Sequence, residues 1–152
     1  MGTSVLFAGI SLILVMVYLA IFVIMLVAAW KVFVKMGLPG WYCIIPFFNV
    51  YVVLRKVWTV KLPFTAYVAG VVLSYLSTFV ISSKTGDYLG FASILILIVF
   101  TVMFNNYVAK AFNKSTGFTV GLVLLPVVFW PILGFGSAYY MGNRYMEGRM
   151  MR

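Results

Sequence analysis

The sequence predicts an all-α integral membrane protein that crosses the bilayer about four times. Of its 152 residues, 65% are hydrophobic and only 9% are charged, whereas soluble domains are about half apolar and about a quarter charged. A soluble fold of this size could not bury so much apolar surface, so lipid must cover the excess. The length fits one compact transmembrane domain over residues 1–152.

The apolar residues form runs of membrane-spanning length. The first, Val5–Trp30, has 26 residues and exceeds the ~30 Å hydrocarbon core at about 1.5 Å per residue. We therefore predict a first span over about 5–30. Three further spans are predicted over the ranges 62–81, 88–110 and 118–141. Glycines and prolines interrupt the last range, which is either a kinked span or a hairpin that returns to the same side.

Residues 41–58 form an apolar segment that is too short to cross a bilayer, and Pro46 interrupts it. Aromatic residues stand at its start, and the basic pair Arg55-Lys56 stands near its end. This pattern is typical of a segment that lies in the membrane interface or enters the bilayer and returns. Both interpretations remain open at the level of the sequence.

Basic residues lie mainly between and after the apolar runs, and the formal net charge is +9. By the positive-inside rule, this distribution predicts a multi-pass membrane protein with its N-terminus outside. The C-terminal arginines break the rule unless the last apolar segment returns. There is no basic stripe on a soluble module, which excludes nucleic acid. We predict contact with anionic lipid headgroups for Lys31, Lys35, Arg55, Lys56, Lys61, Lys110 and Lys114.

The chain repeats one pattern. Lys31-Val32-Phe33-Val34-Lys35 is followed by Gly37 and Pro46, and Lys110-Ala111-Phe112-Asn113-Lys114 is followed by Gly117 and Pro126. The lysines are offset by 79 residues and the prolines by 80. This indicates an internal duplication in parallel orientation, although chance matches are common in apolar sequence of low diversity. Transporters use such repeats, and so do small packed bundles.

These motifs also carry a resemblance to a known family. The chain resembles an uncharacterised family of small bacterial multi-pass membrane proteins, whose members are sometimes labelled signal peptidase I. The resemblance extends over about 31–140, supports the architecture and implies the bacterial cytoplasmic membrane, but it implies no catalytic residue. It rests on Gly40-Trp41, Ile45-Pro46, Asn49, Tyr51, Ala109-Lys110-Ala111-Phe112, Lys114-Ser115-Thr116-Gly117-Phe118, Leu125-Pro126 and Pro131-Ile132-Leu133-Gly134-Phe135-Gly136.

Two groups of residues within the apolar segments are candidates for packing or transport. Small side chains recur at every fourth position of the second span and would let helices approach closely: Ala66, Gly70, Ser74 and Thr78. We expect this stripe to pack within the molecule, with a homodimer seam as the alternative. Three amides in or near apolar segments either hydrogen-bond between helices or line a polar path: Asn49, Asn105 and Asn106.

Catalytic and metal chemistry lack the side chains they need. The sequence has no histidine and one cysteine, Cys43, so clusters of the usual metal ligands cannot form. Its two acids, Asp87 and Glu147, lie outside the predicted spans. A serine–lysine dyad could draw only on Ser82, Ser83 and Lys84, which are adjacent in a short polar loop. We therefore predict no cofactor, no metal and no enzymatic activity.

Three functions remain as hypotheses. The first is a structural or accessory membrane protein that packs against other subunits or against copies of itself. The second is a small channel or carrier with a path at the interface between the repeats. The third, a protein that protects its host membrane against a toxin, has no support beyond size and charge. We favour the first.

Overall fold

A computed structural model describes residues 2–57, 61–79 and 84–142, and the regular elements in these ranges are all helices. They contain one 3₁₀ helix, η1, and six α-helices. In chain order these are α1 (Gly2–Lys35), η1 (Gly40–Ile44), α2 (Phe48–Val57), α3 (Lys61–Phe79), α4 (Lys84–Ala111), α5 (Thr116–Leu124) and α6 (Pro126–Phe135).

Three of these helices are long and apolar enough to cross a membrane. The qualifying stretches are Leu6–Lys35, Lys61–Phe79 and Gly86–Ala111. They correspond to the first three predicted spans, although the end of the range 62–81 lies outside the described residues. The prediction of an all-α membrane protein is confirmed. Helix α2 has 10 residues, or about 15 Å of helix, which is half the hydrocarbon core.

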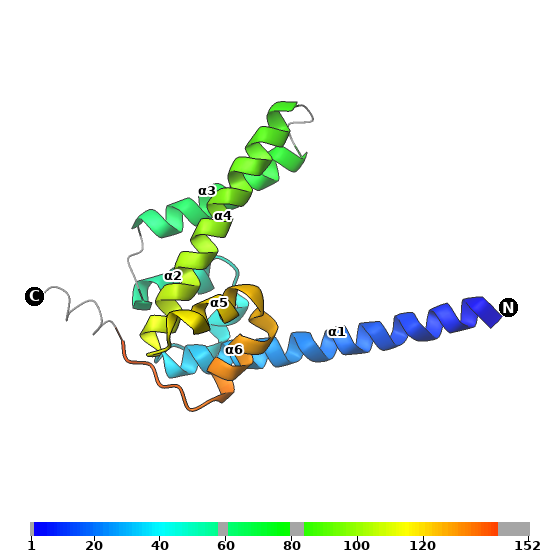
Figure 1. Cartoon of the computed structure of the whole chain (residues 1–152), viewed down its shortest axis with the longest axis horizontal. Coiled ribbons are helices and arrows are strands. Elements are labelled where there is room, and N and C mark those ends of the chain that lie inside the picture. The colour runs from blue at the N-terminus through cyan, green and yellow to red at the C-terminus, as the bar shows by residue number, and fades with distance from the viewer. Residues whose placement is uncertain (1, 58–60, 80–83, 143–152) are drawn as a thin grey trace, which may run out of the picture.

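The long helices are arranged as a pair and a single helix (Figure 1). Helices α3 and α4 form an antiparallel hairpin and lie side by side. Helix α1 projects away from the rest of the molecule over most of its length. Its carboxyl end reaches the carboxyl end of α4, where α2, α5 and α6 gather around both.

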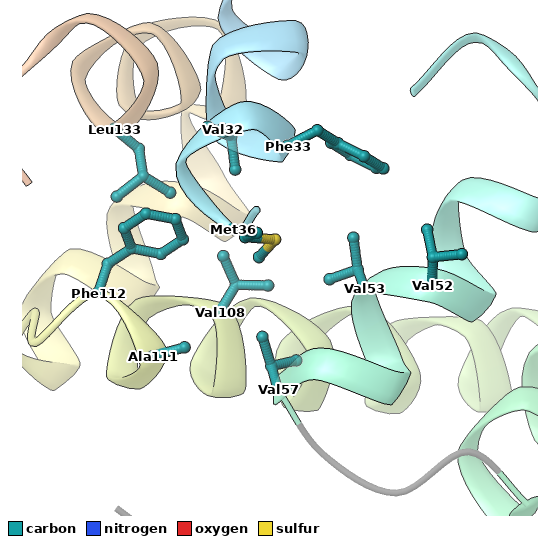
Figure 2. Close-up of a cluster of buried hydrophobic side chains, with 10 residues drawn as sticks. All are labelled: Val32, Phe33, Met36, Val52, Val53, Val57, Val108, Ala111, Phe112 and Leu133. Carbon is teal, nitrogen blue, oxygen red and sulfur yellow. The ribbon is translucent and has the colours of Figure 1, made fainter. Parts of the chain in front are cut away.

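The hydrophobic core lies where the carboxyl ends of α1 and α4 meet (Figure 2). It contains Val32, Phe33 and Met36 of α1; Met36 follows the other two by four and three residues and therefore shares a helix face with them. Its other members are three valines of α2, Leu133 of α6, and Val108, Ala111 and Phe112 at the end of α4. The core therefore joins both halves of the chain at one end of the molecule.

Helices α1 and α4 end in the same type of cap. The N–H groups of Gly37 and Leu38 donate to the carbonyls of Val34 and Phe33, at 2.9 and 3.0 Å. After α4, the N–H groups of the residues at 113 and 114 donate to the carbonyls at 110 and 109, at 3.0 and 2.9 Å. Gly37 and Asn113 both have positive φ, 70° and 53°. These are Schellman caps, which need a residue in the left-handed conformation.

The caps align the two halves differently from the sequence pattern. Gly37 corresponds to Asn113, an offset of 76 residues, whereas the lysines of the repeated pattern are offset by 79. Consequently Lys35 lies in the last turn of α1, while Lys114 lies beyond the end of α4. Different elements follow the two caps, so the structural likeness is limited to the helix ends. The duplication stays a prediction.

Replacing Gly37 with alanine is expected to destabilise the core end of α1. A Cβ there meets no atom within 4 Å, so the cost comes only from the left-handed backbone, about 1–2 kcal/mol for a residue with a side chain. Asn113→Gly should act in the opposite direction at the matching position. Thermal unfolding of the purified protein in detergent measures both. Equal midpoints for the wild type and Gly37→Ala would contradict this account of the cap.

The fourth predicted segment, 118–141, divides into the two short helices α5 and α6. The break is at Leu125, with φ −130° and ψ 59°, and Pro126 opens α6. The rings of Phe118 and Phe129 lie 5.1 Å apart, so the helices fold back on each other. With nine and ten residues, each is about 15 Å long, half the depth of a bilayer. This geometry favours the hairpin over the kinked span.

Candidate functional site

The chain after α6 returns to the end of α4. The N–H of Met141 donates to the carbonyl of Ala111 at 2.9 Å, and the hydroxyl of Tyr140 donates to the carbonyl of Lys56 at 2.7 Å. We call residues 136–142 the strap. Burial raises the pKa of the Tyr140 hydroxyl, which keeps it protonated and able to donate. The strap thus connects α6, α4 and α2 at one end of the molecule.

Lys35 holds the strap and α6 against α1. Its ammonium donates to the carbonyl oxygens of Leu133 and Gly136, at 2.8 and 2.7 Å. The last carbonyls of a helix lack intrahelical partners and carry partial negative charge, so a cation is favourable there. The sequence predicted contact with lipid headgroups for Lys35, but the structure gives its ammonium acceptors within the protein. No sequence signal links Lys35 to α6.

The other predicted headgroup residues differ in exposure. Lys31 is exposed and lies over the Phe135 ring, 4.6 Å from its centroid. Lys114 is half-buried and lies 5.7 Å from the Phe118 centroid. Of the remaining four, Arg55 and Lys61 are exposed, and Lys56 and Lys110 are half-buried.

Asp87, the one acidic residue in the described ranges, is in the first turn of α4, at the opposite end of that helix. The end of the molecule that holds the core is therefore strongly basic.

The stripe of small residues on α3 is only partly in contact with α4. Gly70 is buried, and a Cβ on it would lie 3.0 Å from Cδ2 of Leu97. Ser74 is half-buried, while Ala66 and Thr78 are exposed. Ala66 lines an apolar groove of about 410 Å³ between α3 and α4. Gly70 thus provides the close approach of the two helices.

The three predicted amides do not share one path. Asn49 lines an apolar cavity, where its Nδ2 donates to the carbonyl of Cys43 at 3.3 Å and its Oδ1 accepts the N–H of Val50 at 2.6 Å. Asn105 is buried in α4, and its Nδ2 donates to the carbonyl of Thr101 at 2.9 Å. Neither Asn105 nor Asn106 lines the cavity at Asn49.

That cavity has a volume of about 260 Å³ and lies between five elements of the fold, α1, η1, α2, α4 and α6. Apolar side chains form most of its wall. The full lining is Met25, Ala29 and Phe33 of α1, Cys43 of η1, Asn49, Val50 and Val53 of α2, Phe104 of α4, and Pro126 and Trp130 of α6. Of this lining, sequence reasoning singled out only Asn49 as a path-lining candidate, because the other residues meet it only in the fold.

The turn between η1 and α2 lies beside this cavity and has an unusual backbone. Phe47 has φ 64°, which is an outlier for a bulky residue. Its ring is 5.9 Å from that of Tyr67 in α3. Residues held in such conformations cost about 1–3 kcal/mol and tend to cluster at functional sites. Burial also raises the pKa of the Cys43 thiol, which lowers its reactivity.

The sequence also singled out residues whose surroundings the structure leaves open. Ser82, Ser83, Glu147 and the C-terminal arginines lie outside the described residues. Across 2–57, 61–79 and 84–142, no three residues of the types histidine, cysteine, aspartate and glutamate are grouped as metal ligands would be.

Fold and site together define a small helical membrane protein with a basic end, an apolar cavity and one projecting helix. Residues 41–143 match DUF5684, described as a family of unknown function, and the chain belongs to this family. Helix α1 precedes the matched range. No curated protein and no solved structure shows significant similarity to the chain.

Proposed function

We propose that this protein is a structural or accessory membrane protein that uses α1 to bind a transmembrane helix of another subunit. One observation carries the proposal: every residue from Leu6 to Ile24 is exposed. This stretch has 19 residues and a length of about 28 Å, close to the ~30 Å hydrocarbon core. The helix is therefore free over the full depth of a bilayer.

The fixed end of α1 supports the same proposal. Gly134 of α6 packs directly on Ala28, and Lys35 binds the end of α6. Nearer the carboxyl end of α1, the side chains of Val32 and Met36 pack in the hydrophobic core. In lipid, helices associate by close packing rather than by a hydrophobic driving force. A helix that is anchored at one end and free along its length presents such a packing surface to a partner.

The basic end of the molecule suggests the orientation. By the positive-inside rule, the proposed location is a bacterial cytoplasmic membrane with the core end inside and the N-terminus outside. Exposed Lys31, Arg55 and Lys61 would then contact anionic headgroups, each worth about 1 kcal/mol near the surface. We propose no catalytic role, since the described residues present neither a nucleophile with a base nor a metal site.

Cysteine cross-linking along α1 tests the docking role. Single cysteines are placed at successive positions of 10–20 in a Cys43→Ser background and treated with a short bifunctional thiol reagent in native membranes. A bound helix predicts adducts with the 3.6-residue period of one helical face, and adduct mass separates a foreign subunit from a second copy. Uniformly absent or aperiodic adducts would rule out docking through α1. Matching cysteines at two exposed positions of α4, Phe91 and Leu95, serve as a control.

A second candidate function rests on buried oxygens in α4 and α5. Asn105 Oδ1, Asn106 Oδ1 and Thr119 Oγ1 are buried without a hydrogen-bond partner. Unpaired buried acceptors are rare and often mark bound water or an ion, as a small channel or carrier would need. Ion and solute flux into vesicles containing the protein separates the two functions. Flux that Asn105→Leu abolishes would favour the carrier, and no flux above protein-free vesicles would exclude it.

A further inference from the structure

We propose that the cavity between α1, α2, α4 and α6 binds one acyl chain of an anionic membrane lipid. This site does not depend on the docking role proposed for α1. It lies beside the anchored part of that helix, and polar atoms in the side chains of its wall are limited to Asn49, Cys43 and the indole nitrogen of Trp130. The other seven side chains of the wall are wholly apolar.

The depth of the cavity matches one leaflet of a bilayer. On α1 it extends from Phe33 to Met25, and Lys35 lies two residues beyond Phe33. From Lys35 to Met25 the helix rises about 15 Å, which is half of the ~30 Å hydrocarbon core. An acyl chain whose headgroup lies at the basic end of the molecule would therefore reach the deepest part of the cavity.

The size and polarity of the cavity exclude the other common occupants. A transmembrane helix is about 10 Å wide, and a cavity of about 260 Å³ cannot hold one. Apolar cavities stay free of ordered water because water needs two to four polar partners. Both amide hydrogen bonds of Asn49 are made to the protein's own backbone: its Nδ2 donates to the Cys43 carbonyl and so joins α2 to η1, and its Oδ1 accepts the neighbouring N–H of Val50 within α2. A flexible hydrocarbon chain is the ligand that fits.

Charge selects the headgroup. Lys31, Lys56 and Lys114 lie at the same end as the core, whereas Asp87 lies at the far end of α4. The end of the molecule that holds the core thus carries cations without an acidic counterpart among its described residues. An anionic headgroup is favoured there over a zwitterionic one by electrostatic attraction.

Photo-cross-linking tests the site with the full chain in vesicles of phosphatidylethanolamine and phosphatidylglycerol. The probe is phosphatidylglycerol with a photoreactive group near the end of one acyl chain, and mass spectrometry locates the adducts. Adducts are expected at Met25 and Trp130. Ala29→Phe fills the cavity and should reduce them by about tenfold, equivalent to about 1.4 kcal/mol of binding. The matched control, Ala20→Phe, changes an exposed alanine of the same helix and should leave them unchanged.

Three outcomes would overturn the proposal. Adducts at Leu12 and Leu19 as abundant as those at Met25 would mean ordinary contact with bulk lipid. Equal adducts from a phosphatidylcholine probe would remove the selection of an anionic headgroup. The third outcome uses the wild type and so does not require Ala29→Phe to fold. Bound lipid should slow alkylation of Cys43 relative to delipidated protein, and an unchanged rate would show that the cavity holds no chain.

Discussion

Replacing Gly134 with alanine is expected to separate α6 from α1 and to lower the free energy of unfolding by about 1–3 kcal/mol, the usual cost of overpacking. A Cβ at this position would lie 2.6 Å from the carbonyl oxygen of Ala28 and 3.0 Å from its Cα. Both are backbone atoms of a helix, so neither can rotate away. The whole of α6 would have to move, and the contact that anchors α1 would open.

A matched glycine serves as the control for this prediction. Gly117 is an exposed residue of α5, and a Cβ there would lie 3.7 Å from Oγ of Ser115, an ordinary contact. Gly117→Ala should therefore be neutral or stabilise by up to about 1 kcal/mol, as alanine favours helix. Thermal unfolding in detergent compares the two variants. A midpoint for Gly134→Ala equal to that of Gly117→Ala would show that α6 does not rest on Ala28.

Replacing Lys35 with methionine is expected to release the strap and to destabilise the protein by about 2–3 kcal/mol. The ammonium donates to two carbonyls, and hydrogen bonds of charged groups contribute about 1.5–3 kcal/mol each when well buried. The two bonds would combine to about 3–6 kcal/mol, and we discount this to about 2–3 kcal/mol because the bond to Gly136 is exposed and screened by solvent. Methionine keeps most of the aliphatic stem, so the change isolates the ammonium.

Lys31→Met provides the comparison, one turn earlier on α1. Lys31 is exposed, and its ammonium lies over the face of the Phe135 ring. This interaction is worth about 0.5–1 kcal/mol. Strap release is measured as faster thiol labelling of Ala138→Cys, a half-buried position of the strap, in a Cys43→Ser background. Labelling should accelerate with Lys35→Met and change little with Lys31→Met. Equal rates in both variants would mean that Lys35 does not hold the strap.

Much of the fold follows from the sequence because the bilayer imposes strict lengths. A run such as Val5–Trp30 can only be a spanning helix, and the range 41–58 is too short to be one. The caps were partly readable as well, since Gly37 and Asn113 are the residue types that adopt positive φ. These features depend on local chemistry, so no long-range contact is needed to predict them.

The hairpin and the site depend instead on contacts between distant segments. Pro126 is compatible with a kinked span as well as with a hairpin. The hairpin forms because Gly121 packs against the Phe129 ring and Gly134 packs against the backbone of Ala28. Likewise, the sequence does not tell whether the ammonium of Lys35 reaches a headgroup or a carbonyl. The sequence grouped the three amides as helix–helix hydrogen-bonding or path-lining candidates, whereas the fold places Asn49 at the cavity and Asn105 inside α4.

The central claim is a protein with three helices of spanning length and a hairpin that returns to the basic end. Labelling of single cysteines by a membrane-impermeant thiol reagent tests it most directly, in right-side-out and inverted vesicles of the Cys43→Ser protein. Cysteines at Ser115 and Ser137 should label from one face of the membrane, and a cysteine at Asp87 from the other. Labelling at Ser137 from the same face as Asp87, opposite to Ser115, would show that α5 and α6 cross the bilayer and would contradict the account.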